Sequence, residues 1–289
     1  MVKRELMQIG MPSRTALAAA AHRAAHQVLE HGCIFSDPLA FSILGKDADT
    51  VVRDAAEHPS RRGMRIFIAT RARFAEDSLA AAVKDGVRQL VILGAGLDTF
   101  AYRNPFGDCL RVFEVDALAT QVWKRQLLAE AAIKLPDSLT FVPIDFEREP
   151  LIDKLMAAGF DTEQETFFSW LGVVPYLTEP AVWSTLCLIA GLPNCANVVF
   201  DYNNPPDSLS PKMRIAHDDR AARVAKLGEA FTVYFETSKL HAQLRAIGFA
   251  EIQDLGPPQI FACFFPNFAS SIPESGGHIL NAITILKSE

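Results

Sequence analysis

The stretch Gln89-Leu90-Val91-Ile92-Leu93-Gly94-Ala95-Gly96-Leu97-Asp98-Thr99 decides the fold of this chain. Its apolar first half predicts a buried strand, and Gly94-Ala95-Gly96 predicts a tight turn directly after that strand. Glycine lets backbone approach a ligand closely, at the edge where open parallel sheets bind ligands. A plain structural turn is the alternative. A dinucleotide-binding fingerprint has a third glycine where this chain has Thr99, which disfavours a nicotinamide cofactor.

Strands and helices alternate after this turn. Apolar runs predict further strands at 110–115, 139–144, 166–171 and 197–201. Helices are predicted between them at 117–133, 151–158 and 179–190. Such alternation indicates right-handed βαβ units and a parallel sheet covered on both faces. We therefore expect an α/β fold with a mostly parallel, doubly wound sheet.

The N-terminal region is predicted to be helical. Ser13 can cap a helix over 13–31, in which alanine, leucine and valine recur at helical spacing. Asp37-Pro38 starts a short helix to Leu44, because proline is tolerated in a first turn. Residues 47–59 are polar and read as a connector, and a long helix follows over 61–84.

The alternation breaks after Tyr202. A polar insertion runs to about Gly228 and is partly helical over 212–226. A helix at 238–247 and strands at 251–254 and 279–286 follow it. The phenylalanines of a late, proline-flanked loop are either core residues or the lining of an apolar acceptor pocket; they are Phe261, Phe264, Phe265 and Phe268.

Composition narrows the class of protein. The 289 residues are 49% hydrophobic and 21% charged, as in ordinary globular proteins. A net charge of −6 argues against nucleic acid as a partner, and no apolar run is long enough to span a membrane. The five cysteines are an odd number without a CxxC pair, which favours a reducing cytoplasm and no metal site of the zinc-knuckle type.

Two acidic residues fall at predicted strand ends. Asp116 lies about twenty residues after the glycine turn, where a carboxylate can accept both hydroxyls of a ribose. Capping of the next helix is its alternative role. Asp145 could receive an adenine amino group and Phe146 could cover the ring. A turn-forming aspartate is the alternative, and the residue alone favours it.

Several segments together resemble the leucine carboxyl methyltransferase family. They are Ser13-Arg14-Thr15-Ala16, Asp37-Pro38-Leu39-Ala40, Arg71-Ala72-Arg73-Phe74, residues 91–99, Ala101-Tyr102-Arg103, Phe113-Glu114-Val115-Asp116, Val199-Phe200-Asp201-Tyr202, Gly228-Glu229-Ala230-Phe231 and residues 244–249. They are most similar to its bacterial branch, which includes tetracenomycin polyketide-type O-methyltransferases. The resemblance implies a class I S-adenosylmethionine-dependent methyltransferase fold with a seven-stranded sheet.

The resemblance also implies a set of cofactor-binding residues. Arg71 would bind the methionine carboxylate of S-adenosylmethionine, for which a guanidinium fork is suited; a solvated helix charge is the alternative. Asp116 would bind the ribose, and Asp145 with Phe146 the adenine. Gly94, Ala95, Gly96 and Asp98 complete the set. Many relatives carry a carboxylate at the end of the fourth strand, where this chain has Leu171.

One domain over residues 1–289 is expected, in four parts. They are an N-terminal helical cap (1–60), a cofactor-binding core (61–202), a lid insertion (203–228) and the C-terminal part of the sheet with acceptor-side loops (229–289).

The expected function is an S-adenosylmethionine-dependent O-methyltransferase, with a carboxylate or acidic hydroxyl of a small molecule as the acceptor. A carboxylate needs no base, whereas a phenol or alcohol does. No base stands beside the cofactor segments, and the sequence does not rank Tyr176, Tyr202 and His241. The alternatives are an NAD-dependent oxidoreductase and a non-catalytic sensor or scaffold that binds the cofactor.

Overall fold

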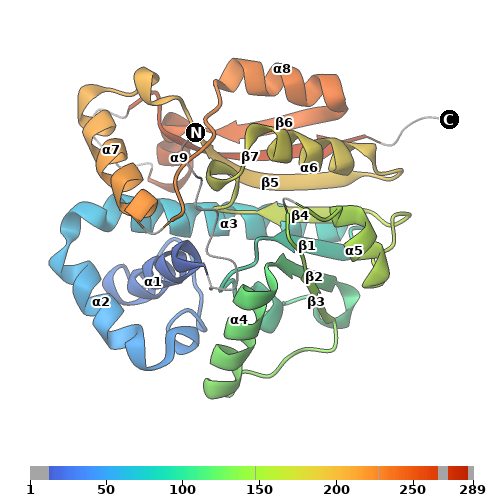
Figure 1. The fold of residues 1–289 in the computed structure, drawn as a ribbon, viewed down its shortest axis with the longest axis horizontal. Coiled ribbons are helices and arrows are strands. Elements are labelled where there is room, and N and C mark those ends of the chain that lie inside the picture. The colour runs from blue at the N-terminus through green and yellow to red at the C-terminus, as the bar shows by residue number, and fades with distance from the viewer. Residues whose placement is uncertain (1–12, 147, 227, 266–272, 286–289) are drawn as a thin grey trace.

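The computed structural model describes residues 13–285, except 147, 227 and 266–272. Its seven-stranded sheet has the order β3-β2-β1-β4-β5-β7-β6 (Figure 1). The strands are β1 (Gln89–Leu93), β2 (Arg111–Asp116), β3 (Leu139–Pro143), β4 (Thr166–Trp170), β5 (Ala196–Asn203), β6 (Phe249–Leu255) and β7 (Gly277–Thr284). Strands β1 to β5 pair in parallel, while β7 is antiparallel to both β5 and β6. This confirms the predicted sheet.

Helices cover both faces of the sheet. Successive residues of β1 point to opposite faces: Leu90 and Ile92 belong to the core beneath α3 (Arg62–Asp85) and α9 (Pro257–Phe264). Val91 and Leu93 belong to the core on the other face, with α5 (Leu151–Ala157), α6 (Glu179–Gly191) and α8 (Thr237–Ile247). Burial on both sides explains why β1 is apolar at nearly every position.

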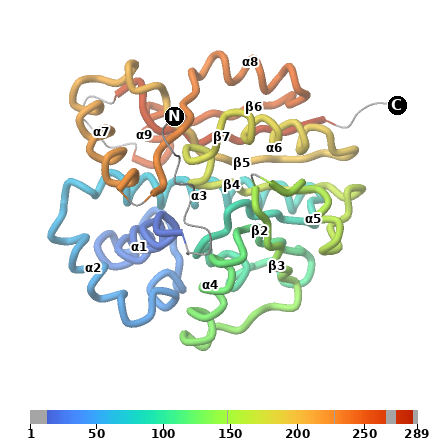
Figure 2. Tube along the Cα trace, viewed as in Figure 1, coloured from blue at the N-terminus to red at the C-terminus, as the bar shows by residue number. Residues whose placement is uncertain are grey.

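Three further helices gather at one end of the sheet, and a fourth packs against β2, where its Lys124 binds the buried Glu114 at 2.7 Å. Figure 1 shows α1 (Arg14–Leu29), α2 (Ala48–Glu57) and α7 (Pro211–Lys226) at the left, with α4 (Leu118–Glu130) below. The trace in Figure 2 shows that α1 and α7, far apart in sequence, both lie at this end. Ser13 caps α1 as predicted, because its side chain accepts a hydrogen bond from the Ala16 backbone.

Two N-terminal predictions are wrong. The helix expected from Asp37 to Leu44 is a turn followed by a 3-10 helix (Ser42–Asp47), which Gly45 interrupts with a φ of 56°. The connector expected over 47–59 contains helix α2. Its small apolar residues Ala48 and Ala55 are buried, and its polar residues face outward. Because the apolar side of this helix is narrow, the sequence pattern indicated a polar connector and not a helix.

The late aromatic segment is also not the predicted loop. Phe261 and Phe264 belong to helix α9, whose first turn holds Pro257. Phe264 and Phe265 pack against buried residues of the core beneath α3, and Phe268 lies outside the described residues. Within the described ranges, no helix is both long and apolar enough to cross a membrane.

Candidate cofactor site

A cavity of about 1160 Å³ opens at the carboxyl ends of β1, β2, β3 and β4. The structure brings together every residue that the sequence analysis proposed for the cofactor: Arg71, Gly94, Ala95, Gly96, Asp98, Asp116, Asp145 and Phe146 all line it. We call this space the cofactor cavity. Its remaining walls come from α1, the start of α4 and residues 228–232, which follow α7.

The glycine turn forms the cavity floor. Gly94 and Gly96 have φ values of 66° and 44°, which favour glycine. A Cβ atom on Gly94 would lie 2.3 Å from Cγ2 of Val173, and one on Gly96 would lie 2.9 Å from Cβ of Ala16. The turn therefore needs both glycines for packing as well as for its backbone conformation.

Asp116 links the glycine turn to Ala117, the residue that directly precedes α4. Its carboxylate accepts hydrogen bonds from the backbone N–H groups of Gly96, at 2.6 Å, and Ala117, at 2.7 Å. Helix α4 has no side-chain cap, so the capping alternative is wrong. Burial raises the pKa of the Asp116 carboxyl, and the bond from Gly96 opposes this shift. A carboxylate offers about four acceptor positions, which leaves room for ligand hydroxyls.

Asp145 and Phe146 lie at the rim of the cavity. The Asp145 side chain is 49% exposed and lies 3.6 Å from the Arg148 guanidinium. Its carbonyl also accepts the backbone N–H groups of Arg148 and Glu149. Asp145 therefore forms a turn, and its side chain still faces the cavity, so the two roles weighed from the sequence are compatible.

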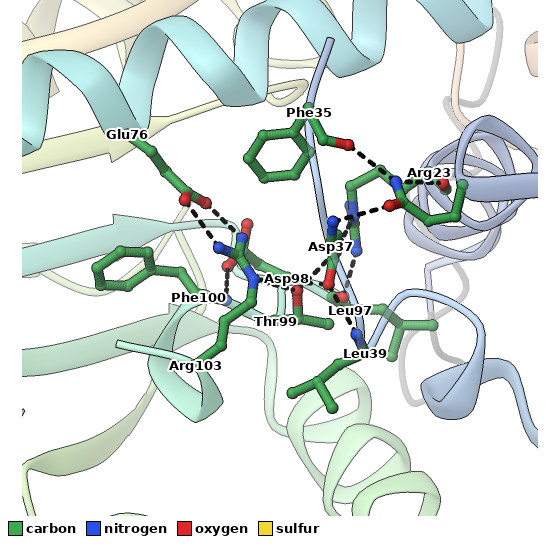
Figure 3. A network of polar contacts seen from close by, with 11 residues as sticks. Arg23, Phe35, Asp37, Leu39, Glu76, Leu97, Asp98, Thr99, Phe100 and Arg103 are labelled. Atoms are coloured by element: carbon green, nitrogen blue, oxygen red, sulfur yellow. Dashed lines mark hydrogen bonds and ion pairs between the residues drawn. The ribbon is translucent and has the colours of Figure 1, made fainter. Parts of the chain in front are cut away.

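A buried ion network fixes the far side of the glycine turn (Figure 3). Asp37 contacts the guanidinium groups of Arg23, at 3.3 Å, and Arg103, at 3.5 Å. The Thr99 hydroxyl donates to the same carboxylate at 2.7 Å, and Arg103 also binds Glu76. Sequence reasoning assigned no role to this network. The only signal was that Asp37, Thr99 and Arg103 lie in the segments of the family resemblance.

Arg71 is not a solvated helix charge. It projects from α3, its side chain is only 12% exposed, and its Nη1 donates to Oδ2 of Asp201 at 2.8 Å. Leu171, at the position where relatives carry a carboxylate, lines the cavity and packs against the core beneath α3. Asp201 also accepts the backbone N–H of Gly172.

Glu229 closes the cavity between α1 and the segment that follows α7. Its carboxylate accepts the backbone N–H groups of Arg14, at 2.8 Å, and Thr15, at 3.2 Å. These are orphan donors of the first turn of α1, where the helix dipole favours a negative charge. A residue 215 positions from Arg14 therefore caps the first described helix.

Comparison with known sequences identifies the family. A sequence model of leucine carboxyl methyltransferases matches residues 16–190. The chain belongs to the leucine carboxyl methyltransferase family. The YktD protein of Bacillus subtilis, named as a candidate S-adenosyl-L-methionine-dependent methyltransferase, is 36% identical over 201 residues, which are 68% of this chain and 65% of that protein.

Other relatives agree. A Frankia alni protein with the same description is 35% identical over 185 residues, which cover 62% of this chain and 64% of its own length. The matched part of this chain thus spans slightly less than two thirds of the length of each of these two relatives. A solved structure, a possible exported protein from Bordetella parapertussis, is 12% identical, has a TM-score of 0.50 and covers 94% of this chain and 96% of its own, which supports the fold alone.

The comparisons confirm the predicted family, and the relatives within it are named as candidate S-adenosyl-L-methionine-dependent methyltransferases. They do not support the oxidoreductase alternative, and the structure gives the reason for Thr99. Its hydroxyl is bound to Asp37, so the residue that breaks the dinucleotide fingerprint takes part in the ion network around Asp37.

The cofactor cavity has the chemistry that S-adenosylmethionine requires. It offers a guanidinium for a carboxylate, a buried carboxylate for a ribose and a bare glycine turn for close backbone approach. The three candidate bases differ in position. Tyr176 lines the cavity. Tyr202 and His241 do not line it, and both are hydrogen-bonded to Asp254.

Proposed function

We propose that this methyltransferase transfers a methyl group to the carboxylate of a small molecule. One observation carries the proposal: among the described residues that line the cofactor cavity, none is a histidine or a cysteine. Burial raises the pKa of Tyr176 to about 12, so this phenol stays protonated near neutral pH. A carboxylate acceptor is already ionised there and needs no base.

The acidic side chains of the cavity support the same conclusion. A base for a neutral hydroxyl works best with a pKa near the operating pH and a free lone pair. Each of three carboxylates accepts a hydrogen bond from a backbone N–H. Asp98 accepts from Phe100, Asp116 accepts from Gly96, and Glu229 accepts from Arg14 in the first turn of α1. These three carboxylates hold backbone in place, and Glu149 in the same lining accepts the Asp145 backbone N–H and pairs with Lys154. Each of these four side chains therefore has a structural partner, which favours an acceptor that needs no base.

The proposed cofactor contacts follow from the lining. Arg71 holds the methionine carboxylate, Asp116 the ribose hydroxyls, and Asp145 with Phe146 the adenine. The backbone of Gly94, Ala95 and Gly96 and the residue Asp98 complete the proposed contacts. When bound, S-adenosylmethionine supplies a methyl group already activated on a sulfonium. The task of the protein is to orient the acceptor carboxylate behind that methyl group and to exclude water.

The acceptor is expected to be a carboxylic acid with an apolar body. Phe35, Ile68, Ala72 and Leu177 line the cavity alongside the proposed cofactor contacts. The volume of about 1160 Å³ exceeds the roughly 300–1,000 Å³ typical of a pocket for one drug-sized ligand, so cofactor and a small acceptor can share it.

The test uses S-adenosylmethionine with an isotopically labelled methyl group and shape-matched acceptors: apolar carboxylic acids, their primary amides and phenols. We expect label only in the acids, as methyl esters that release labelled methanol in alkali. The dependence of kcat/KM on pH should be flat from about pH 6 to 8, because the acceptor is ionised throughout and Tyr176 stays protonated.

Other outcomes would contradict the proposal in distinct ways. Alkali-stable methyl ethers, with kcat/KM rising with pH, would assign a hydroxyl acceptor. Tight binding of S-adenosylhomocysteine without turnover of any acceptor would favour the sensor or scaffold alternative.

A further inference from the structure

One carboxylate at the end of β5 holds two parts of the cofactor cavity at once. Asp201 is only 4% exposed. Its Oδ2 accepts from Nη1 of Arg71 at 2.8 Å, and its Oδ1 accepts the backbone N–H of Gly172. Asp201 itself does not line the cavity, whereas Arg71 and Gly172 do. The hydrogen bonds of Asp201 therefore reach the cavity through these two residues.

The three residues come from three separate elements. Arg71 lies on α3, Asp201 on β5, and Gly172 in the turn after β4, two residues beyond Trp170. Gly172 has a φ of 74°, and a Cβ atom there would lie 2.6 Å from Nη2 and 3.0 Å from Nη1 of Arg71. The guanidinium thus lies against bare backbone, in a position that only glycine permits.

This arrangement is relevant to the apolar residue at position 171. The side chain of Leu171 offers no hydrogen-bond acceptor at the end of β4, but Asp201 brings a carboxylate to the very next backbone N–H. The bond to Arg71 takes one of the five guanidinium N–H groups, and the others can serve a ligand. Because the guanidinium is already paired and fixed, less ordering is needed when a ligand binds.

We propose that Asp201 is the positioning residue of the methionine end of the cofactor: it fixes the Arg71 guanidinium and the Leu171–Gly172 backbone for the carboxylate of S-adenosylmethionine. The proposal rests on the function proposed above for Arg71. It predicts that loss of Asp201 weakens ligands with an amino-acid end and spares those without one. A residue that only stabilises the fold would weaken both kinds of ligand equally.

The experiment compares two ligands by calorimetry. S-adenosylhomocysteine carries the amino-acid end, and 5′-methylthioadenosine shares the adenosine and the sulfur but lacks it. In Asp201→Asn we expect the Kd for S-adenosylhomocysteine to rise by roughly 10- to 100-fold, the range for hydrogen bonds to charged groups. The Kd for 5′-methylthioadenosine should change less than about twofold, because that ligand has no group to meet Arg71.

A matched control separates positioning from stability. Asp254 has the same side-chain exposure as Asp201, 6%, and is bound by Tyr202 and His278, but it does not line the cavity. Asp254→Asn should lower the melting temperature and leave the Kd for S-adenosylhomocysteine, divided by the Kd for 5′-methylthioadenosine, as in the wild type. Arg71→Lys should raise this ratio of Kd values as Asp201→Asn does, because lysine lacks the planar fork of the guanidinium.

The outcomes are distinguishable. If Arg71→Lys is selective for S-adenosylhomocysteine and Asp201→Asn is not, the positioning role is wrong and the proposed role of Arg71 stands. If neither variant is selective, the assignment of Arg71 to the methionine carboxylate fails as well. Should Asp201→Asn not fold, Asp201→Glu serves instead, since its longer side chain displaces the guanidinium; an unchanged ratio in that variant would overturn the proposal.

Discussion

At the scale of single residues, several side chains around the cofactor cavity form hydrogen bonds that fix the backbone of the glycine turn. Asp116 binds the Gly96 N–H, and Asp98 binds the Phe100 N–H. Thr99 donates to Asp37, which also contacts Arg23 and Arg103. The glycine turn is therefore fixed before a ligand arrives, and fixed donors lose less entropy on binding.

Asp116 gives a direct test of the proposed ribose contact. In Asp116→Ala we expect S-adenosylhomocysteine binding to weaken by about 1–3 kcal/mol, because charge-assisted hydrogen bonds to the ribose are lost. Calorimetry measures the change, and far-ultraviolet circular dichroism checks the fold. Asp161→Ala is the control: Asp161 does not line the cavity and bonds only near the amino ends of β1 and β4. Unchanged affinity in a folded Asp116→Ala would leave this carboxylate with a structural role in the turn.

At the scale of elements, α1 lines the cavity directly, whereas α7 leads into it through the lining segment 228–232 that follows this helix. Glu229 ties the segment after α7 to the first turn of α1. In contrast, His217 is the buried residue of α7, which otherwise exposes charged side chains such as Arg214 and Asp218. Segments with few buried apolar contacts open at low free energy, and lids are commonly drawn from them. We propose that α7 acts as a lid over the acceptor.

Hydrogen exchange tests the lid. We expect α7 (Pro211–Lys226) to exchange rapidly in the free protein and more slowly once S-adenosylhomocysteine and an acceptor acid are bound. In Glu229→Ala this ligand-dependent protection should shrink, and the first turn of α1 should also exchange faster. Removing a capping group costs about 0.5–2 kcal/mol of helix stability.

The control for this experiment is Glu236→Ala. Glu236 likewise stands at a helix N-terminus, that of α8, but its side chain is 52% exposed and does not line the cavity. Equal protection of α7 with and without ligands would contradict the lid, and α7 would then be a surface helix that takes no part in binding.

At the scale of the whole molecule, the melting temperature of the protein reports which cofactor the native state binds. A ligand that binds only the native state stabilises it by mass action, by about 2.7 kcal/mol at a concentration 100 times its Kd. We expect S-adenosylhomocysteine to raise the melting temperature and NAD to leave it unchanged. A shift with NAD alone would contradict the assignment of the cavity to S-adenosylmethionine.

The central sheet and the site could be predicted because their signals are local. The apolar run of β1, the glycines after it and Asp116 at the end of β2 each follow from the physics of a buried parallel strand and its carboxyl edge. The role of Arg71 came from the family resemblance instead, because the residue alone reads as a solvated helix charge. All the proposed cofactor residues line one cavity. The predicted strand bounds differ from those in the structure by a few residues, as is usual at element ends.

What could not be predicted depends on contacts between distant segments. Helix α2 has a narrow apolar side, formed by two alanines between charged residues, which gives a weak helical pattern in the sequence. The partners in the ion network of Asp37 and Thr99 are 62 residues apart, and those in the Arg71–Asp201 pair are 130 residues apart. No periodicity in the sequence reports such pairs, because each partner alone resembles an ordinary surface charge or a helix cap.

The position of β7 has a consequence for how the chain is made. This strand comes last among the described elements, yet it lies between β5 and β6 and pairs with both. On the ribosome, β5 therefore emerges with an unpaired edge that carries Val198, Val199 and Phe200, and it keeps that edge until the final strand is released. Unpaired apolar edges promote association between chains. We therefore expect the nascent protein to be most prone to aggregation before β7 has emerged from the ribosome.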